Sequence, residues 1–150
     1  MPDKSNSNWV NHNYFDTQGN ECVYIKENAS YNIVEHNECH GQLDAKSGGM
    51  SVRGSHNILR FNLISGNKGA GIRLGGDTPA NGIYNKVYGN TLRNNEYTGL
   101  KIMVLPQALL CGNSIEYTKE YKSSRGADIR PVRGTYAQGI DPTAACPGSL

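Results

Sequence analysis

Short clusters of apolar residues recur along the chain, and each of them contains an asparagine at the same position. The asparagines of five such clusters are 24, 25, 28 and 23 residues apart. An apolar residue stands three positions before each asparagine, and another stands two positions after it. The five asparagines are Asn13, Asn37, Asn62, Asn90 and Asn113. A repeat of this length predicts a solenoid with one coil for every 22 to 28 residues.

Between these clusters, apolar and polar residues alternate in four segments: 23–26, 50–53, 72–75 and 100–103. Alternation with a period of two predicts strands with one side inside and one side outside. Strands that recur once per coil stack in register as parallel sheets, about 4.8 Å apart, so that each side chain lies on its counterpart from the next coil. A stacked asparagine suits a turn, because its amide can bond backbone groups freed at the bend.

This layout resembles the right-handed parallel β-helix. We therefore expect an all-β solenoid of about five coils over residues 9–116, within a single domain that spans residues 1–150. A left-handed β-helix is disfavoured because its six-residue period is absent. A β-sandwich would not explain why one residue type recurs in the same column.

The high glycine content and low hydrophobicity of the chain are compatible with the predicted solenoid. The chain has 18 glycines, only 37% hydrophobic residues and a mean hydropathy of −0.58, values that also fit a disordered chain. Nine tyrosines and many apolar clusters argue against disorder. A solenoid needs only a thin core, because each coil is completed by its neighbours.

Residues 42–48 and 76–84 lengthen their coils, and we expect them to protrude beside a binding surface. Residues 117–150 leave the repeat and are predicted to form a C-terminal cap. At the other end, either Trp9 and the residues before it make a minimal cap, or the chain stacks on another copy or on a missing N-terminal region.

The four cysteines predict disulfides. A Cys111–Cys146 bridge would fold the C-terminal tail over the last coil. A second bridge would join Cys22 and Cys39 within one coil, although Cys39 also fits a small core residue. An even number of bridged cysteines favours a secreted, extracellular or periplasmic location, with the signal peptide absent from this chain. No apolar run approaches the roughly 20 residues of a membrane span.

The outward positions of the alternating segments gather cations. Lys26, Arg53, Arg73 and Lys101 lie there together with Tyr24, while the whole chain has a net charge of only +2. Cations repeated once per coil match an extended anionic polymer. We expect an acidic polysaccharide as partner and no nucleic acid, because the basic excess that nucleic-acid binding requires is missing.

Lys26 and Arg53 occupy the same column on successive coils. A neighbouring permanent cation favours the neutral form of a lysine, which is the form that acts as a base. β-Elimination in a uronic-acid polymer needs such a base and a cation that stabilises the charge developing beside the carboxylate. Lys26 as base and Arg53 as neutraliser or proton carrier would meet these needs.

The segments 19–26, 49–54 and 69–74, with Asn32 and Asn37 between them, resemble the core of polysaccharide lyase family six, the alginate lyase and chondroitinase B group. The resemblance implies that Lys26 and Arg53 are catalytic and that Glu21 is a calcium ligand. The family's arginine is usually followed by histidine, whereas here Gly54 follows and His56 comes three residues after Arg53. With Tyr24, Arg73 and Lys101, His56 completes the expected substrate-binding set. The family's enzymes are at least twice as long as this chain.

Three functions remain open at this stage: a lyase of acidic polysaccharides, a non-catalytic glycan-binding module, and a structural module that assembles with other copies. Outward lysine and arginine side chains are also common as simple solvated charges, and one carboxylate is a poor calcium site. No set of paired aspartates typical of polygalacturonase-like hydrolases is present, so hydrolysis is disfavoured.

Overall fold

The chain is an all-β solenoid, as the repeat predicts. The computed structural model describes residues 5–76, 78–116, 127–129 and 140–148. Its strands form three parallel five-stranded sheets. Sheet A contains β1 (Trp9–Asn11), β4 (Ile33–Glu35), β7 (Ile58–Arg60), β10 (Lys86–Tyr88) and β13 (Leu109–Cys111). Sheet B contains β2 (Tyr14–Asp16), β5 (Glu38–His40), β8 (Leu63–Ser65), β11 (Thr91–Arg93) and β14 (Ser114–Glu116). Sheet C contains β3 (Val23–Ile25), β6 (Gly48–Val52), β9 (Ala70–Leu74), β12 (Thr98–Ile102) and β15 (Ala127–Ile129).

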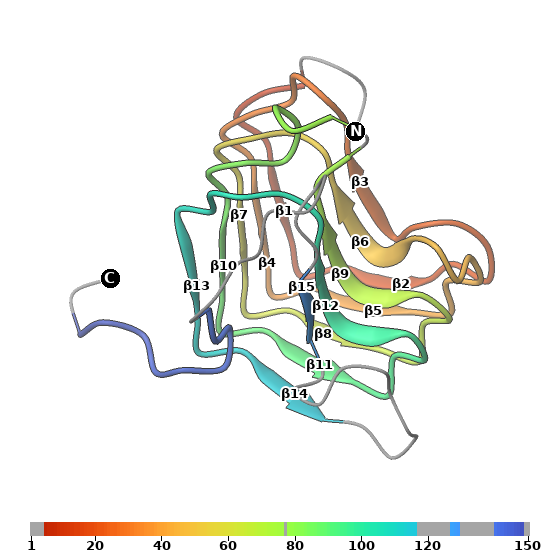
Figure 1. Cartoon of the computed structure of the whole chain (residues 1–150). Helices are drawn as coiled ribbons and strands as arrows, with labels where there is room; N and C mark the ends of the chain where they lie inside the picture. Colours follow the sequence, from red (N-terminus) through yellow and green to blue (C-terminus); the bar gives the residue numbers. More distant parts are fainter. Residues whose placement is uncertain (1–4, 77, 117–126, 130–139, 149–150) are drawn as a thin grey trace.

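Each coil contributes one strand to every sheet, so the chain winds around a three-sided interior (Figure 1). The solenoid is right-handed, and about four turns of the chain connect the first and last of the five strands in each sheet, against the five coils expected. The strands pair in the register that the repeat predicts: Val34 lies between Val10 and Leu59. β15 lies in the segment that we expected to form a cap, and it pairs with β12.

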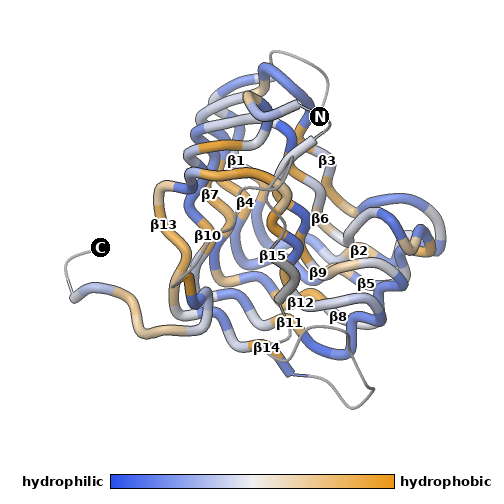
Figure 2. Tube along the Cα trace, viewed as in Figure 1, coloured by the Kyte–Doolittle hydropathy of each residue, from blue (hydrophilic) through white to orange (hydrophobic). Residues whose placement is uncertain are grey.

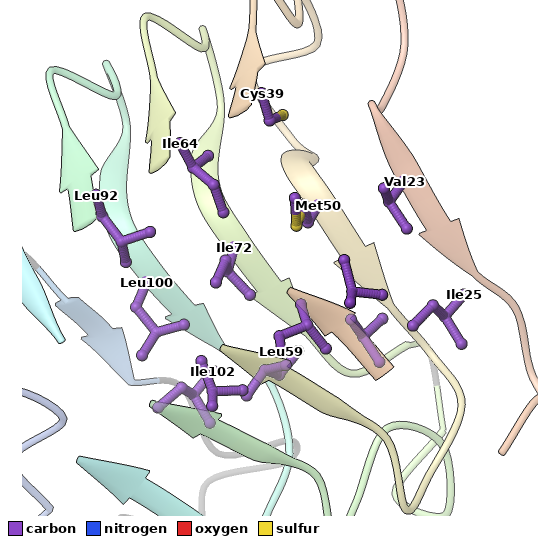
Figure 3. Packing of buried hydrophobic residues seen from close by; sticks show 14 of the residues in the cluster. Val23, Ile25, Cys39, Met50, Leu59, Ile64, Ile72, Leu92, Leu100 and Ile102 are labelled. Carbon is purple, nitrogen blue, oxygen red and sulfur yellow. The ribbon is translucent and has the colours of Figure 1, made fainter. Parts of the chain in front are cut away.

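The core is a stack of aliphatic side chains, one layer for each coil. Met50, Ile72 and Leu100 share one column of sheet C and are fully buried. Figure 3 shows these side chains pointing into the interior, which they share with Leu59 of sheet A, drawn nearer to Ile102. Hydrophobic segments accordingly recur at the same place in successive coils, as at β7, β10 and β13 (Figure 2).

Three columns of stacked amides hold the three corners. At the corner between sheets A and B, the Asn37 backbone N–H and its Nδ2 both donate to Asn62 Oδ1, at 3.0 and 3.1 Å. This ladder is the predicted one and continues through all five asparagines. The sequence analysis missed the other two. They run through Asn8, Asn32, Asn57, Asn85 and Gln107 between sheets C and A, and through Gln42, Asn67 and Asn95 between sheets B and C.

Both expected disulfides are present. Cys22 is bonded to Cys39, whose side chain is also fully buried in the core, and Cys111 is bonded to Cys146. Beside the second bridge, Asn113 Nδ2 donates to the Pro142 carbonyl oxygen at 3.0 Å. The C-terminal segment therefore ends the first amide ladder, because Pro142 accepts the hydrogen bond that a further asparagine would accept.

Candidate functional site

The outer side of sheet C carries Tyr24 and the four predicted cations in two columns. Tyr24 is in register with Ser51, and Ser51 with Arg73, which is in turn in register with Lys101. Lys26 and Arg53 follow directly after their strands, and the Arg53 backbone N–H donates to the Ile25 carbonyl at 2.7 Å. Lys26 and Arg53 thus occupy matching positions on neighbouring coils, as predicted.

The Tyr24 ring lies close to two of the cations. Lys26 Nζ is 6.0 Å from the ring centroid, and Arg53 Cζ is 5.7 Å from it. Cations at this distance from an aromatic face are attracted by its quadrupole. Burial raises the pKa of the Tyr24 phenol, with the charges of Glu27 and Glu21 acting in the same direction and Arg53 opposing them. The phenol therefore stays neutral around Lys26 and Arg53, and it offers a ring surface with a hydrogen-bonding tip.

Arg53 is positioned by two neighbours that the sequence analysis did not include. Its Nη1 donates to Glu27 Oε1 at 3.3 Å. A Cβ placed on Gly76 would lie 3.3 Å from Arg53 Cδ, so the loop that begins at residue 76 lies against the arginine side chain. A hydrogen bond from its own backbone N–H, followed by the interaction with Arg53, lowers the pKa of Glu27. Glu27 has no counterpart in the repeat, and only its place beside Lys26 could have suggested it.

Arg73 and Lys101 occupy the expected outward positions of sheet C, but their side chains are covered rather than accessible. Their exposed fractions are only 8% and 7%. Lys101 Nζ lies 5.1 Å from the centroid of the Tyr97 ring and donates to the Lys46 carbonyl at 3.4 Å. Lys46 belongs to the loop predicted over residues 42–48, which therefore reaches over sheet C to this lysine. Alternation along a strand shows which side chains point outward, but it does not show what covers them.

Two regions of the outer side of sheet C can thus be distinguished. We call Tyr24, Lys26 and Arg53 the open cluster, because Lys26 is exposed and the other two side chains are partly exposed. We call Arg73 and Lys101 the covered pair. Of the four predicted cations, Lys26 and Arg53 of the open cluster are the more exposed.

The residues around Glu21 do not fit a calcium ion. Glu21 accepts a hydrogen bond from the Ser47 hydroxyl. Calcium takes about six to eight oxygen ligands, and within the described residues no group of three or more histidine, cysteine, aspartate or glutamate side chains is placed to hold a metal. Glu21 instead orders the loop through Ser47, and no step below uses calcium.

His56 lies away from the open cluster, at the corner between sheets C and A. Its ring stacks between those of Tyr31 and Tyr84, with centroid distances of 5.6 and 5.4 Å. The sequence analysis placed His56 in one substrate-binding set with Tyr24 because it follows Arg53 closely. The chain turns between the two residues, so they face different directions.

Comparison with known proteins identifies the family. The family described as "Right handed beta helix region" matches residues 3–103. Neither a search of curated proteins nor a search of solved structures gives a match, so the resemblance to polysaccharide lyase family six stays a prediction. The part of the chain with described coordinates contains no helix long and apolar enough to cross a membrane, and the two disulfides are consistent with an extracellular location. Because the match covers more than half of the chain, and the three parallel sheets agree with it, the protein belongs to the right-handed β-helix family.

Proposed function

We propose that the protein binds an acidic polysaccharide at the open cluster. The observation that carries this proposal is the Tyr24 ring flanked by Lys26 and Arg53, from neighbouring coils, in a chain that is nearly neutral overall. Membership of the β-helix family supports a carbohydrate-related or structural role. The open cluster favours the first, because it combines charge with a ring surface.

The chemistry of the cluster suits a uronic-acid unit. The carboxylate of the sugar pairs with Arg53, for which it competes with Glu27, and with Lys26. The apolar side of the sugar ring packs on the accessible part of Tyr24. A guanidinium favours planar carboxylates, whereas the lysine acts as a movable point charge. The cluster thus recognises a repeated carboxylate rather than one particular hydroxyl pattern.

The test compares two polymers that differ only in charge. The protein is titrated with polygalacturonate and alginate oligosaccharides, and with the same oligosaccharides after reduction of their carboxyl groups to alcohols. We expect calorimetry to detect binding to the acidic forms alone, with an affinity that falls as salt rises. Equal affinity for acidic and reduced oligosaccharides, or no binding to either acid, would overturn the proposal.

A second function, cleavage by β-elimination, is favoured by the exposure of Lys26 beside Arg53. In this reaction the Lys26 amine removes the proton from the carbon beside the carboxylate, while Arg53 stabilises the charge that develops on the carboxylate. The electron pair forms a carbon–carbon double bond, the bond to the glycosidic oxygen breaks, and the leaving oxygen takes a proton from water.

Ultraviolet absorbance separates this function from binding alone. Cleavage produces unsaturated sugar ends that absorb, and Lys26→Ala should abolish the signal. If alginate, dermatan and pectic polymers all give no absorbing product, with and without calcium, cleavage is excluded while the binding proposal stands. If calorimetry also shows no binding, and the mass in light scattering rises with concentration, the protein is a structural module.

A further inference from the structure

A row of three aromatic rings lines the corner between sheets C and A. Tyr31, His56 and Tyr84 come from three successive coils, and adjacent rings in the row are inclined by only 18° and 26°. The two tyrosines are 64% and 44% exposed, and His56 is exposed as well. Because neighbouring rings cover each other's faces, the row presents ring edges, phenol oxygens and an imidazole to solvent at the spacing of the coils.

The backbone under this row is unusual for aromatic residues. Tyr31, His56 and Tyr84 have φ values of 60°, 62° and 57°, in the left-handed region that costs an ordinary residue about 1–2 kcal/mol. The equivalent positions at the corner between sheets B and C are held by Gly41, Gly66 and Asn94. Glycine or asparagine would therefore satisfy the turn, and the aromatic side chains are not needed to form it. Stacking offsets part of the cost, at about 0.5–1.5 kcal/mol for each pair.

A cavity of about 250 Å³ lies along the row. Besides the three rings, Ile58 and Ala108 give it apolar walls, and Lys86 places an exposed ammonium group at it. None of the residues that line this cavity has a carboxylate. The cavity combines an apolar surface, a row of hydrogen-bonding groups and one cation. We call it the corner groove.

We propose that the corner groove is a second saccharide-binding site, which takes an acidic oligosaccharide segment lying along the solenoid axis. Sugar rings pack on Ile58 and Ala108, their hydroxyls bond the phenol oxygens and the His56 imidazole, and a carboxylate meets Lys86. The charge of the lining selects the occupant, because a cation without a neighbouring carboxylate favours an anionic ligand over a neutral one. This inference rests on the proposed function for its class of ligand and adds a separate site.

A second site on the same solenoid changes how a polymer binds. A long chain that engages the open cluster is held near the corner groove, so the second contact forms at a high effective concentration. Short oligosaccharides gain nothing from this effect, and their binding to each site can be measured separately. The two sites thus predict a gain in affinity with polymer length.

The test removes one ring from the row without straining the fold. Gly accepts the His56 conformation readily, so His56→Gly is expected to fold. The matched control is His36→Gly: His36 has a φ of 53° and stacks between His12 and Phe61 in the other aromatic row. With both histidines present, acidic tetrasaccharides should shift the NMR signals of the His56 imidazole and leave those of His36 in place.

Both variants are then placed in the Lys26→Ala/Arg53→Ala background and titrated with the same oligosaccharides. We expect His56→Gly to weaken the residual binding about tenfold, as for the loss of one hydrogen-bonding group and one ring contact, and His36→Gly to leave it unchanged. Equal effects of the two variants, or an equal His56 shift with poly-glutamate, would overturn the corner groove while leaving the open cluster intact. Absence of all saccharide binding by the unmodified protein would instead refute the proposed function.

Discussion

The open cluster and the covered pair use the same kinds of side chain on one face of sheet C, yet they serve different ends. Lys26 and Arg53 stand around a partly exposed ring, whereas Lys101 is buried against Tyr97 and the Lys46 carbonyl. Burial decides which partner a cation has. A covered cation stabilises the fold through protein groups, and an accessible cation is available to a ligand. Four substitutions test this difference between accessible and covered cations.

The largest effect is expected from a substitution in the amide ladder between sheets B and C. This ladder lies just before β9 and β12, the strands that carry Arg73 and Lys101. Asn67 is fully buried, its Oδ1 accepts from the Gln42 backbone N–H at 3.0 Å, and its Nδ2 donates to Asn95 Oδ1 at 2.9 Å. Asn67→Ala leaves several buried partners unsatisfied and should lower the free energy of unfolding by about 3–5 kcal/mol. Urea denaturation measures it, with the exposed neighbour Lys68→Ala as control. A loss of stability no larger than that of the control would contradict a structural role for the amide ladder between sheets B and C.

The next effect concerns the open cluster. Lys26→Ala/Arg53→Ala should weaken binding of acidic oligosaccharides by at least about 100-fold, since two charged hydrogen bonds are lost and each contributes about 1.5–3 kcal/mol. The free energy of unfolding should change by less than about 1 kcal/mol, because the pair of Arg53 and Glu27 is partly exposed. Lys68→Ala/Arg93→Ala removes the same charge elsewhere and should bind almost normally in calorimetry. Equal loss in both double variants would mean that net charge alone attracts the ligand.

Lys101→Met tests the covered pair. The methionine keeps much of the apolar stem and removes the ammonium group from Tyr97 and the Lys46 carbonyl. We expect the free energy of unfolding to fall by about 1–2 kcal/mol and oligosaccharide affinity to stay unchanged. Lys26→Met should show the reverse, with reduced affinity and normal stability. If Lys101→Met reduces affinity while stability is kept, the covered pair takes part in binding after all.

The smallest effect is expected from Glu27→Gln. The pKa of Glu27 is lowered in the folded protein, so its carboxylate contributes stability above its unfolded pKa, and this contribution is lost as the pH falls through the folded pKa. At pH 7 the variant should be less stable by under about 1 kcal/mol, and the difference should vanish as the pH falls through the pKa of Glu27 in the folded protein, which lies below the ordinary glutamate value of 4.5. Oligosaccharides should bind the variant slightly more tightly, because their carboxylates no longer compete with Glu27. Thermal unfolding across pH, with Glu38→Gln as control, tests both the size and the sign.

The repeat made the fold predictable because one residue type recurs at one column. Asn13 and its counterparts predicted the first amide ladder, and the alternation of apolar and polar residues around Met50 and Ile72 predicted sheet C. The two other ladders carried a signal that was overlooked: an asparagine or glutamine stands five residues before or after many of the first set, as in Asn57, Asn62 and Asn67. Disulfide pairing followed from the need to cover the last coil.

The candidate site was predictable only in part. The column shared by Lys26 and Arg53 follows from strand register, which a sequence repeat encodes. The covering of Lys101 depends on a loop without periodicity, and the separation of His56 from Arg53 depends on a turn with a positive φ at an aromatic residue. The sequence of a loop without a repeat does not show which strand the loop covers, and a positive φ is uncommon at any residue other than glycine.

The amide ladders also determine which changes of length the molecule can accept. Each ladder asparagine donates hydrogen bonds to the equivalent asparagine one coil further on. The coils before and after any given coil therefore present nearly the same hydrogen-bonding groups to it. Removal of a single residue within a strand would turn the remaining side chains of that strand to the opposite side. Removal or duplication of one whole coil keeps every side chain on its own side and rejoins the same partners. For this protein the natural step of insertion and deletion is therefore about two dozen residues, as the 24- and 25-residue spacings record, and growth by whole coils would lengthen the corner groove without redesigning its walls.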